Sequence, residues 1–205
     1  MPIDRWKSYR EPRRFQMITV ALLFISGGMA TALYGSEPVP QMSAERFEKM
    51  FLQSMPDHHN MAVVMSQICL EKTQRSELRT LCQQIITAQE REIGLMQRWL
   101  NTWYGLQKSP QMASDDRAMV ERMRAMSTPE FEKEYMIMMI RHHWQAVSQS
   151  GQCIERAHDL HRDLEALCES MVEDQVDEVR KLRDWLCNWF GNCNVRSDGD
   201  LHPKP

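Results

Sequence analysis

Residues 69–82 read CLEKTQRSELRTLC, and residues 153–168 read CIERAHDLHRDLEALC. Each stretch holds a polar turn with a cysteine on either side, and apolar residues recur at helical spacing in the segments around it. If each turn joins two antiparallel helices, its two cysteines lie at similar heights on the facing helices. Both stretches therefore predict a helical hairpin, one in each half of the chain.

The two halves are copies of one sequence unit. Aligning the histidine pair at 58–59 with the pair at 142–143 brings many uncommon residues into register, which implies an internal duplication. The matches include Phe47 with Phe131, Met55 with Met139, Ala62 with Ala146, Cys69 with Cys153 and, after two extra residues in the second turn, Cys82 with Cys168, Gln89 with Gln175, Glu92 with Glu178 and Trp99 with Trp185. Helices are expected near 43–70, 77–104, 129–157 and 162–190. Two such hairpins bury their apolar faces best as an all-α four-helix bundle.

The composition indicates a helical body with an excess of acidic residues. Leu, Met, Gln, Glu and Arg are abundant and favour helix, and 205 residues are enough to bury a sizeable core. Residues 1–32 carry five basic and two acidic side chains; taking them from the totals of 25 and 28 leaves 20 basic and 26 acidic. Such a body repels phosphate, so no nucleic-acid partner is expected, but it is compatible with attracting cations.

Residues 17–35, MITVALLFISGGMATALYG, carry no charge and follow a basic stretch. As a helix they would extend about 28 Å, close to the hydrocarbon thickness of a membrane. We interpret residues 1–35 as a signal peptide, with a cleavage site at Ala30-Thr31-Ala32, or as a retained anchor; a buried core helix is the alternative. The rest of the chain is then exported to the periplasm and meets the membrane only through this segment.

Export makes the six cysteines candidates for disulfides. The cysteines of each turn would face each other across a hairpin, and the last two flank NWFGN, where Gly191 lets the chain fold back. Buried free thiols and thiolate metal ligands are the alternatives. We predict three local bridges, Cys69–Cys82, Cys153–Cys168 and Cys187–Cys193.

The segment between the copies, residues 105–128, is a polar linker. Gly105 and Pro110 end the first copy, and residues 114–116 are placed to cap a short helix that is rich in methionine. The sequence STPE at 127–130 supplies an N-cap and a first-turn proline for the next helix. Residues 191–205 form a polar tail.

Residues 55–65 read MPDHHNMAVVM, and residues 139–143 read MIRHH. Positions 55, 58, 62, 65 and 69 share one helix face, and the register set by a 69–82 bridge places Met96 level with Met55. We therefore predict a pocket that contains Met55, His58, His59 and Met96. Thioethers favour Cu(I) and imidazole suits both copper oxidation states, although a methionine stripe is more often core filler.

These residues resemble domain-of-unknown-function family 305, exported ferritin-like helical proteins with the pattern M-x-x-H-H-x-x-A-x-x-M, then Q-x-x-E-I-x-x-M-x-x-W-L. The first copy matches throughout, with Met55, His58, His59, Ala62, Met65, Gln89, Glu92, Ile93, Met96, Trp99 and Leu100. The resemblance covers about 43–104 and 129–190 and implies a four-helix bundle, copper binding and a role in copper tolerance. The candidate metal ligands are Met55, His58, His59, Met61, Met65, Met96, Met138, Met139, His142 and His143.

The second copy departs from this pattern. Gln149 stands where Met65 does and Leu182 stands where Met96 does, so two sulfurs are missing together. Met136 and Met138 are placed to compensate, since Met138 lies four residues before His142. We expect a weaker or differently built second site; the alternative is that ligands from both copies converge across the bundle.

We predict that the protein sequesters copper or relays it to an accepting or exporting protein. Two other functions are the alternatives. A di-iron oxidase on this bundle needs two Glu-x-x-His motifs, but only Glu155 and His158 have that spacing. We interpret His158 and His161 as solvated turn residues. The second alternative is an interaction module whose linker methionines bind a partner helix without metal. No Ser-His-Asp set stands out, and we expect no enzymatic activity.

Overall fold

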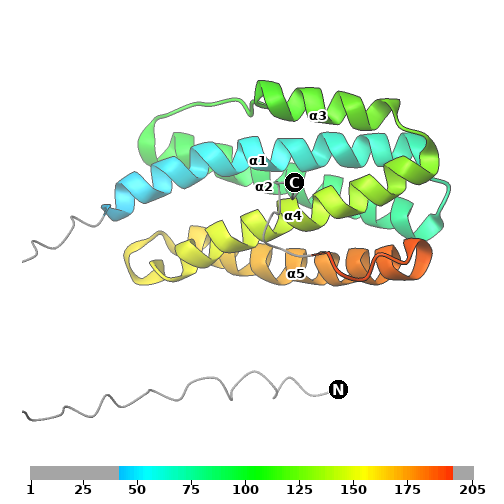
Figure 1. Cartoon of the computed structure of the whole chain (residues 1–205). Helices are drawn as coiled ribbons and strands as arrows, with labels where there is room; N and C mark the ends of the chain where they lie inside the picture. The colour runs from blue at the N-terminus through cyan, green and yellow to red at the C-terminus, as the bar shows by residue number, and fades with distance from the viewer. Residues whose placement is uncertain (1–41, 196–205) are drawn as a thin grey trace, which may run out of the picture. The chain divides into compact units, whose positions relative to one another are not determined.

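The computed structural model describes residues 42–195 (Figure 1). Within this range no residue lies in a strand, and no helix is long and apolar enough to cross a membrane. The predicted signal or anchor segment at 17–35 and the end of the tail lie outside the described residues. The helices are α1 (Ala44–Lys72), α2 (Ser76–Tyr104), α3 (Ser114–Ala125), α4 (Thr128–Ile154) and α5 (Arg162–Phe190), with a 3₁₀ turn, η2 (Ala157–Asp159), before α5.

The long helices form the predicted all-α bundle of two hairpins. α1 pairs with α2 and α4 pairs with α5, and the hairpins meet through α1 and α4. The short linker helix α3 lies on the outer side of α1, where it contacts α1 and α4 (Figure 1). The helix expected to end near residue 157 ends at Ile154, because the longer second turn accommodates its extra residues as η2.

Helix ends follow the local sequence signals. Ser43 caps α1 by accepting a hydrogen bond from the backbone N–H three residues on (3.3 Å). Ser127 and Glu130 form a reciprocal capping box at the start of α4. Helices α2 and α5 end at Gly105 (φ 65°) and Gly191 (φ 66°), whose left-handed backbone is disfavoured for a residue with a Cβ. The glycines and the STPE sequence thus act at helix ends as predicted. The predicted capping of α3 by residues 114–116 is wrong, because Ala113 stands at its N-cap and no side chain caps it.

The three predicted disulfides are present. Two of them join facing helices within a hairpin, with Cα atoms 6.3 Å apart in each, and their four cysteines are fully buried. The described residues hold no free cysteine, so no thiolate remains for a metal. The bridges are Cys69–Cys82, Cys153–Cys168 and Cys187–Cys193.

The bundle core consists of two apolar clusters. One, which includes Ile68 and Tyr135, lies toward the first turn, and the other, which includes Phe51 and Leu164, lies toward the second. All four long helices contribute polar side chains between the clusters. We call this set the polar layer; it comprises His58, His59, Gln89, Glu92, His142, His143, Gln175 and Glu178. Burying polar groups costs free energy unless they are paired. A buried polar layer therefore indicates a functional site.

Further polar contacts tie the hairpins together. The hydroxyls of Ser66 and Tyr135 are hydrogen-bonded at 2.9 Å. The backbone N–H and Nδ1 of His161 donate to the buried carboxylate of Glu48 at 2.6 and 2.8 Å, and the His161 ring stacks on Trp103 with centroids 3.9 Å apart. His161 is exposed, with 48% of its side chain accessible, as expected for a solvated turn residue, and it also joins the second turn to α1 and α2.

Candidate metal-binding pocket

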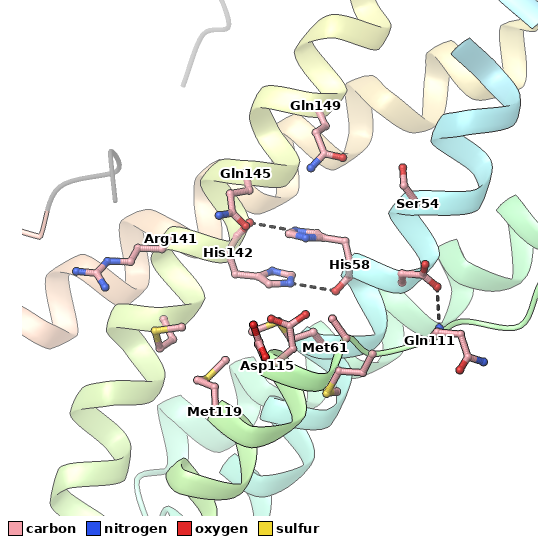
Figure 2. Close-up of a pocket in the computed structure, with 15 residues that line it drawn as sticks. Ser54, His58, Met61, Gln111, Asp115, Met119, Arg141, His142, Gln145 and Gln149 are labelled. Carbon is pink, nitrogen blue, oxygen red and sulfur yellow. Dashed lines mark hydrogen bonds between the residues drawn. The ribbon is translucent and has the colours of Figure 1, made fainter. Parts of the chain in front are cut away.

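The polar layer borders a cavity of about 800 Å³ between α1, α3 and α4, which we call the interhelical pocket (Figure 2). Helices α1 and α4 supply two imidazoles, and the linker closes the opposite side. The side chains that could donate to a metal are His58, His142, Met61, Met112, Met119, Met138, Asp57, Asp115 and Asp116.

His58 and His142 meet at the junction of the two hairpins. Their rings are stacked, with centroids 3.6 Å apart and planes 12° apart. Nε2 of His58 donates to the backbone carbonyl of His142 (3.1 Å), and Nε2 of His142 donates to that of His58 (3.0 Å). A carbonyl oxygen can only accept, so both rings carry their proton on Nε2 and keep the lone pair on Nδ1. Nδ1 of His142 is buried and has no hydrogen-bond partner.

The environment holds both rings neutral. Burial, together with the nearby imidazole of His59, lowers the pKa of His58 from 6.5 to about 3, against the opposing effect of its hydrogen bond to His142. Burial and the neighbouring imidazoles also lower the pKa of His142 well below 6.5. A histidine must be neutral to coordinate a metal, so both rings are in the form that binds metal ions.

His59 and His143 are buried inside the bundle and do not line the pocket. Nε2 of His59 donates to Glu92, and Nε2 of His143 donates to Glu178, each at 2.7 Å. Neither imidazole has any exposed surface, and Nδ1 of each has no hydrogen-bond partner. A carboxylate that accepts from one ring nitrogen is the usual support behind a metal-ligating histidine. These two rings are thus oriented like metal ligands, but toward the interior.

The structure divides the ten candidate ligands into two groups. Those that line the pocket are His58, Met61, Met138 and His142. Those that are fully buried and do not line it are Met55, His59, Met65, Met96, Met139 and His143. Adjacent helix positions point about 100° apart; here His58 faces the pocket, whereas His59 points into the bundle toward Glu92. Of the four residues predicted to share a pocket, only His58 lines this one.

The linker supplies part of the site, although the predicted ligand set contained no linker residue. Met112 and Met119 line the pocket, and Asp57 holds the linker in place through an ion pair with Lys108. The sequence predicted a short methionine-rich helix that includes Met119 and Met123. Such a prediction does not tell which neighbouring helix the methionines will contact.

The donor set of the pocket is soft and mostly neutral. Among the residues that the structure describes, no three His, Cys, Asp or Glu side chains are grouped so as to hold a metal ion. The pocket instead combines two imidazoles with four thioethers, a set that suits copper and particularly Cu(I). Fold and site together define a helical bundle with a soft-donor pocket at the junction of two hairpins.

The sequence matches the family described as domain of unknown function DUF305 over residues 48–186, a range that includes both hairpins and the linker. The chain belongs to this family. A search of curated proteins gave no match.

Solved structures with the same fold include metal-bound proteins. CopM in its Cu(I)-bound form is 26% identical with a TM-score of 0.62, and the match covers 70% of this chain and 98% of that chain. A DUF305 protein of Streptomyces coelicolor, described as secreted, is 29% identical (TM-score 0.62; 71% and 93% covered). A DUF305 fragment from Deinococcus radiodurans is 25% identical (TM-score 0.61; 72% and 99% covered). The chain is therefore similar to a protein solved with bound copper.

Proposed function

We propose that this protein binds copper, mainly as Cu(I), in the interhelical pocket, and sequesters or relays it outside the cytoplasm as part of copper tolerance. The observation that carries this proposal is the convergence of two neutral imidazoles and four thioethers on one cavity. The similarity to CopM, solved in Cu(I)-bound and Cu(II)-bound forms, supports copper as the metal. The similarity to a protein described as secreted supports an extracytoplasmic location.

The pocket suits copper in an oxidising compartment. Thioethers remain available as ligands where thiols form disulfides, as all six cysteines do here. The thioethers need no deprotonation, and Nδ1 of His142 already presents a lone pair. Neutral ligands of this kind can be replaced one at a time by those of an accepting protein. Equilibrium binding and ligand exchange account for the proposed role, and no catalytic step is required.

A pair of adjacent methionines tests the assignment. Met138 lines the pocket, whereas Met139 is fully buried in the core. Changing either to leucine removes a sulfur at nearly constant volume. Competition with a Cu(I) chelator should show the double variant Met61→Leu/Met138→Leu binding about tenfold more weakly or worse, a loss of ~1.4 kcal/mol. The matched control Met139→Leu should keep the wild-type affinity. Equal affinities for both variants would refute the pocket as the site.

One observation favours a second candidate location for copper, beside His59. Nδ1 of His59 is buried and unpaired, and Met55 and Met96 are fully buried in the adjoining cluster. If copper bound there, Met96→Leu rather than Met138→Leu would weaken binding. The second copy already carries Leu182 at the position of Met96, which shows that leucine is tolerated in this fold.

Metal analysis of protein purified from its native compartment separates the wider alternatives. Bound copper supports the proposal. Bound iron would instead favour an oxidase, and a tightly associated protein without metal would favour an interaction module.

A further inference from the structure

Half of the thioethers in the interhelical pocket come from outside the repeated hairpins. Met61 and Met138 lie on α1 and α4, whereas Met112 and Met119 lie in the linker. We call residues 106–126 the linker arm. An ion coordinated by sulfurs from both sources would join the linker arm to the bundle.

The linker arm buries few of its residues against the bundle. Val120 and Met123 are its only buried residues. Its ion pair between Arg124 and Glu71 (2.6 Å) is exposed, with 42% and 57% of the two side chains accessible. Exposed ion pairs add little stability. Within each hairpin, by contrast, a buried disulfide joins the two helices, and apolar clusters fill the core. We therefore expect the linker arm to be the part of the pocket that moves most easily.

Asp57 connects the linker arm to the imidazole pair. It precedes His58 in α1, and one of its carboxylate oxygens accepts a hydrogen bond from the backbone N–H of Gln111 at 2.7 Å (Figure 2). The other oxygen pairs with the ammonium of Lys108. Since Gln111 precedes Met112, this clamp sets the position of a linker thioether relative to the pocket.

We propose that the linker arm is a metal-responsive cover of the interhelical pocket. Met112 and Met119 complete the coordination of a soft monovalent ion, so the arm is fixed while the ion is bound. Undocking of the arm removes two ligands and exposes the ion to an incoming partner ligand. This inference rests on the proposed copper-binding function. Because binding and docking are linked, ion binding strengthens docking by the same factor by which docking strengthens ion binding.

Hydrogen exchange of the full chain with and without Ag(I), a soft monovalent probe that stays in one oxidation state, tests the cover. Amides within 106–126 should exchange about tenfold more slowly with Ag(I), whereas those of α5 should change little. Met119→Leu should remove most of this protection and weaken Ag(I) binding about tenfold. The matched control Met126→Leu, at the end of the same helix but outside the pocket lining, should alter neither.

The Lys108→Ala variant provides a second test. The direction in which it changes the Ag(I) affinity distinguishes docking of the arm from simple electrostatics. Lys108 does not line the pocket, but it pairs with Asp57. Removing its positive charge alone should favour a bound cation. Loosening the clamp should instead weaken Ag(I) binding severalfold and speed exchange of the arm in the metal-free protein. Weaker binding is the result that the cover predicts.

The outcomes distinguish a failure of the proposed cover from a failure of the proposed copper-binding function. Ag(I) binding with unchanged exchange in 106–126, protection that persists in Met119→Leu, or tighter binding by Lys108→Ala would each overturn the cover and leave metal binding intact. Absence of any Ag(I) or Cu(I) binding would overturn the proposed function and the cover with it.

Discussion

His58 and His142 stack ring on ring at the junction of the hairpins, and each donates its Nε2 proton to the backbone carbonyl of the other. The two residues occupy the same position in the two sequence copies, so their contact is reciprocal. Duplication has thereby produced an imidazole pair that neither copy forms by itself. Each member leaves its Nδ1 lone pair for another partner, which is the feature that makes a metal-binding role physically reasonable.

The neutral pair predicts a loss of stability in acid. In the unfolded chain both histidines titrate near 6.5, whereas the folded pKa of His58 is about 3 and that of His142 is well below 6.5. Between these values the unfolded chain binds more protons, so the free energy of unfolding falls as pH drops from about 6.5 toward 3. Urea unfolding at several pH values measures this slope. His58→Gln should reduce it, and an unchanged slope would contradict the neutral, buried assignment.

The same lowered pKa values predict how copper binding responds to pH. Exposed histidine ligands become protonated near pH 6 and lose their metal. His58 and His142 stay neutral well below that value, so the Cu(I) affinity should change little between pH 7 and pH 5. A competition titration corrected for protonation of the chelator would show this. A fall of about tenfold or more over this range would indicate ordinary, exposed histidines as the main ligands.

Ser66 and Ser150 are equivalent in the two copies, but only Ser66 has a hydroxyl partner. Tyr135 lies 2.9 Å from Ser66, whereas Phe51 occupies the copy-related position and the Ser150 hydroxyl is buried and unpaired. Phe51→Tyr should supply the missing hydrogen bond and raise the free energy of unfolding by about 1 kcal/mol. Tyr135→Phe should lower the free energy of unfolding by about 1–3 kcal/mol, because the buried Ser66 hydroxyl then lacks a hydrogen-bond partner. Chemical denaturation checks both signs, and a destabilised Phe51→Tyr would show that the copies pack differently here.

The three disulfides should differ in their resistance to reduction. The bridges at the two turns are fully buried, whereas Cys193 is exposed and Cys187 is only partly covered. Mild reductant followed by alkylation and mass spectrometry should modify Cys187 and Cys193 first. Loss of the Cys153–Cys168 bridge should then cost about 3 kcal/mol of unfolding free energy, from the loop that it closes. Simultaneous opening of all three bridges would contradict this order.

The hairpins and disulfides could be predicted because their signals are local. A turn flanked by cysteines constrains two facing helices directly. The repeat indicates that the second half folds into the same kind of hairpin as the first. The register inside one hairpin likewise placed Met55 and Met96 in the same cluster. Contacts within one hairpin thus follow from spacing and the position of the turn.

The pocket depends on contacts that spacing does not encode. His58 and His59 are adjacent, yet one meets His142 on the other hairpin and the other meets Glu92 on its own hairpin. Which histidine faces which helix is decided by how the hairpins dock. The position of Met119 in the pocket similarly depends on where α3 packs. No periodic pattern in the polar linker determines which helices α3 contacts.

The most direct measurement is a crystal structure of the protein loaded with Cu(I), with the ion located by anomalous scattering. The account predicts an anomalous peak inside the interhelical pocket, bonded to an imidazole Nδ1 of His58 or His142 and to sulfurs among Met61, Met112, Met119 and Met138. Peaks found only beside His59 or His143, or only on the outer surface, would contradict it.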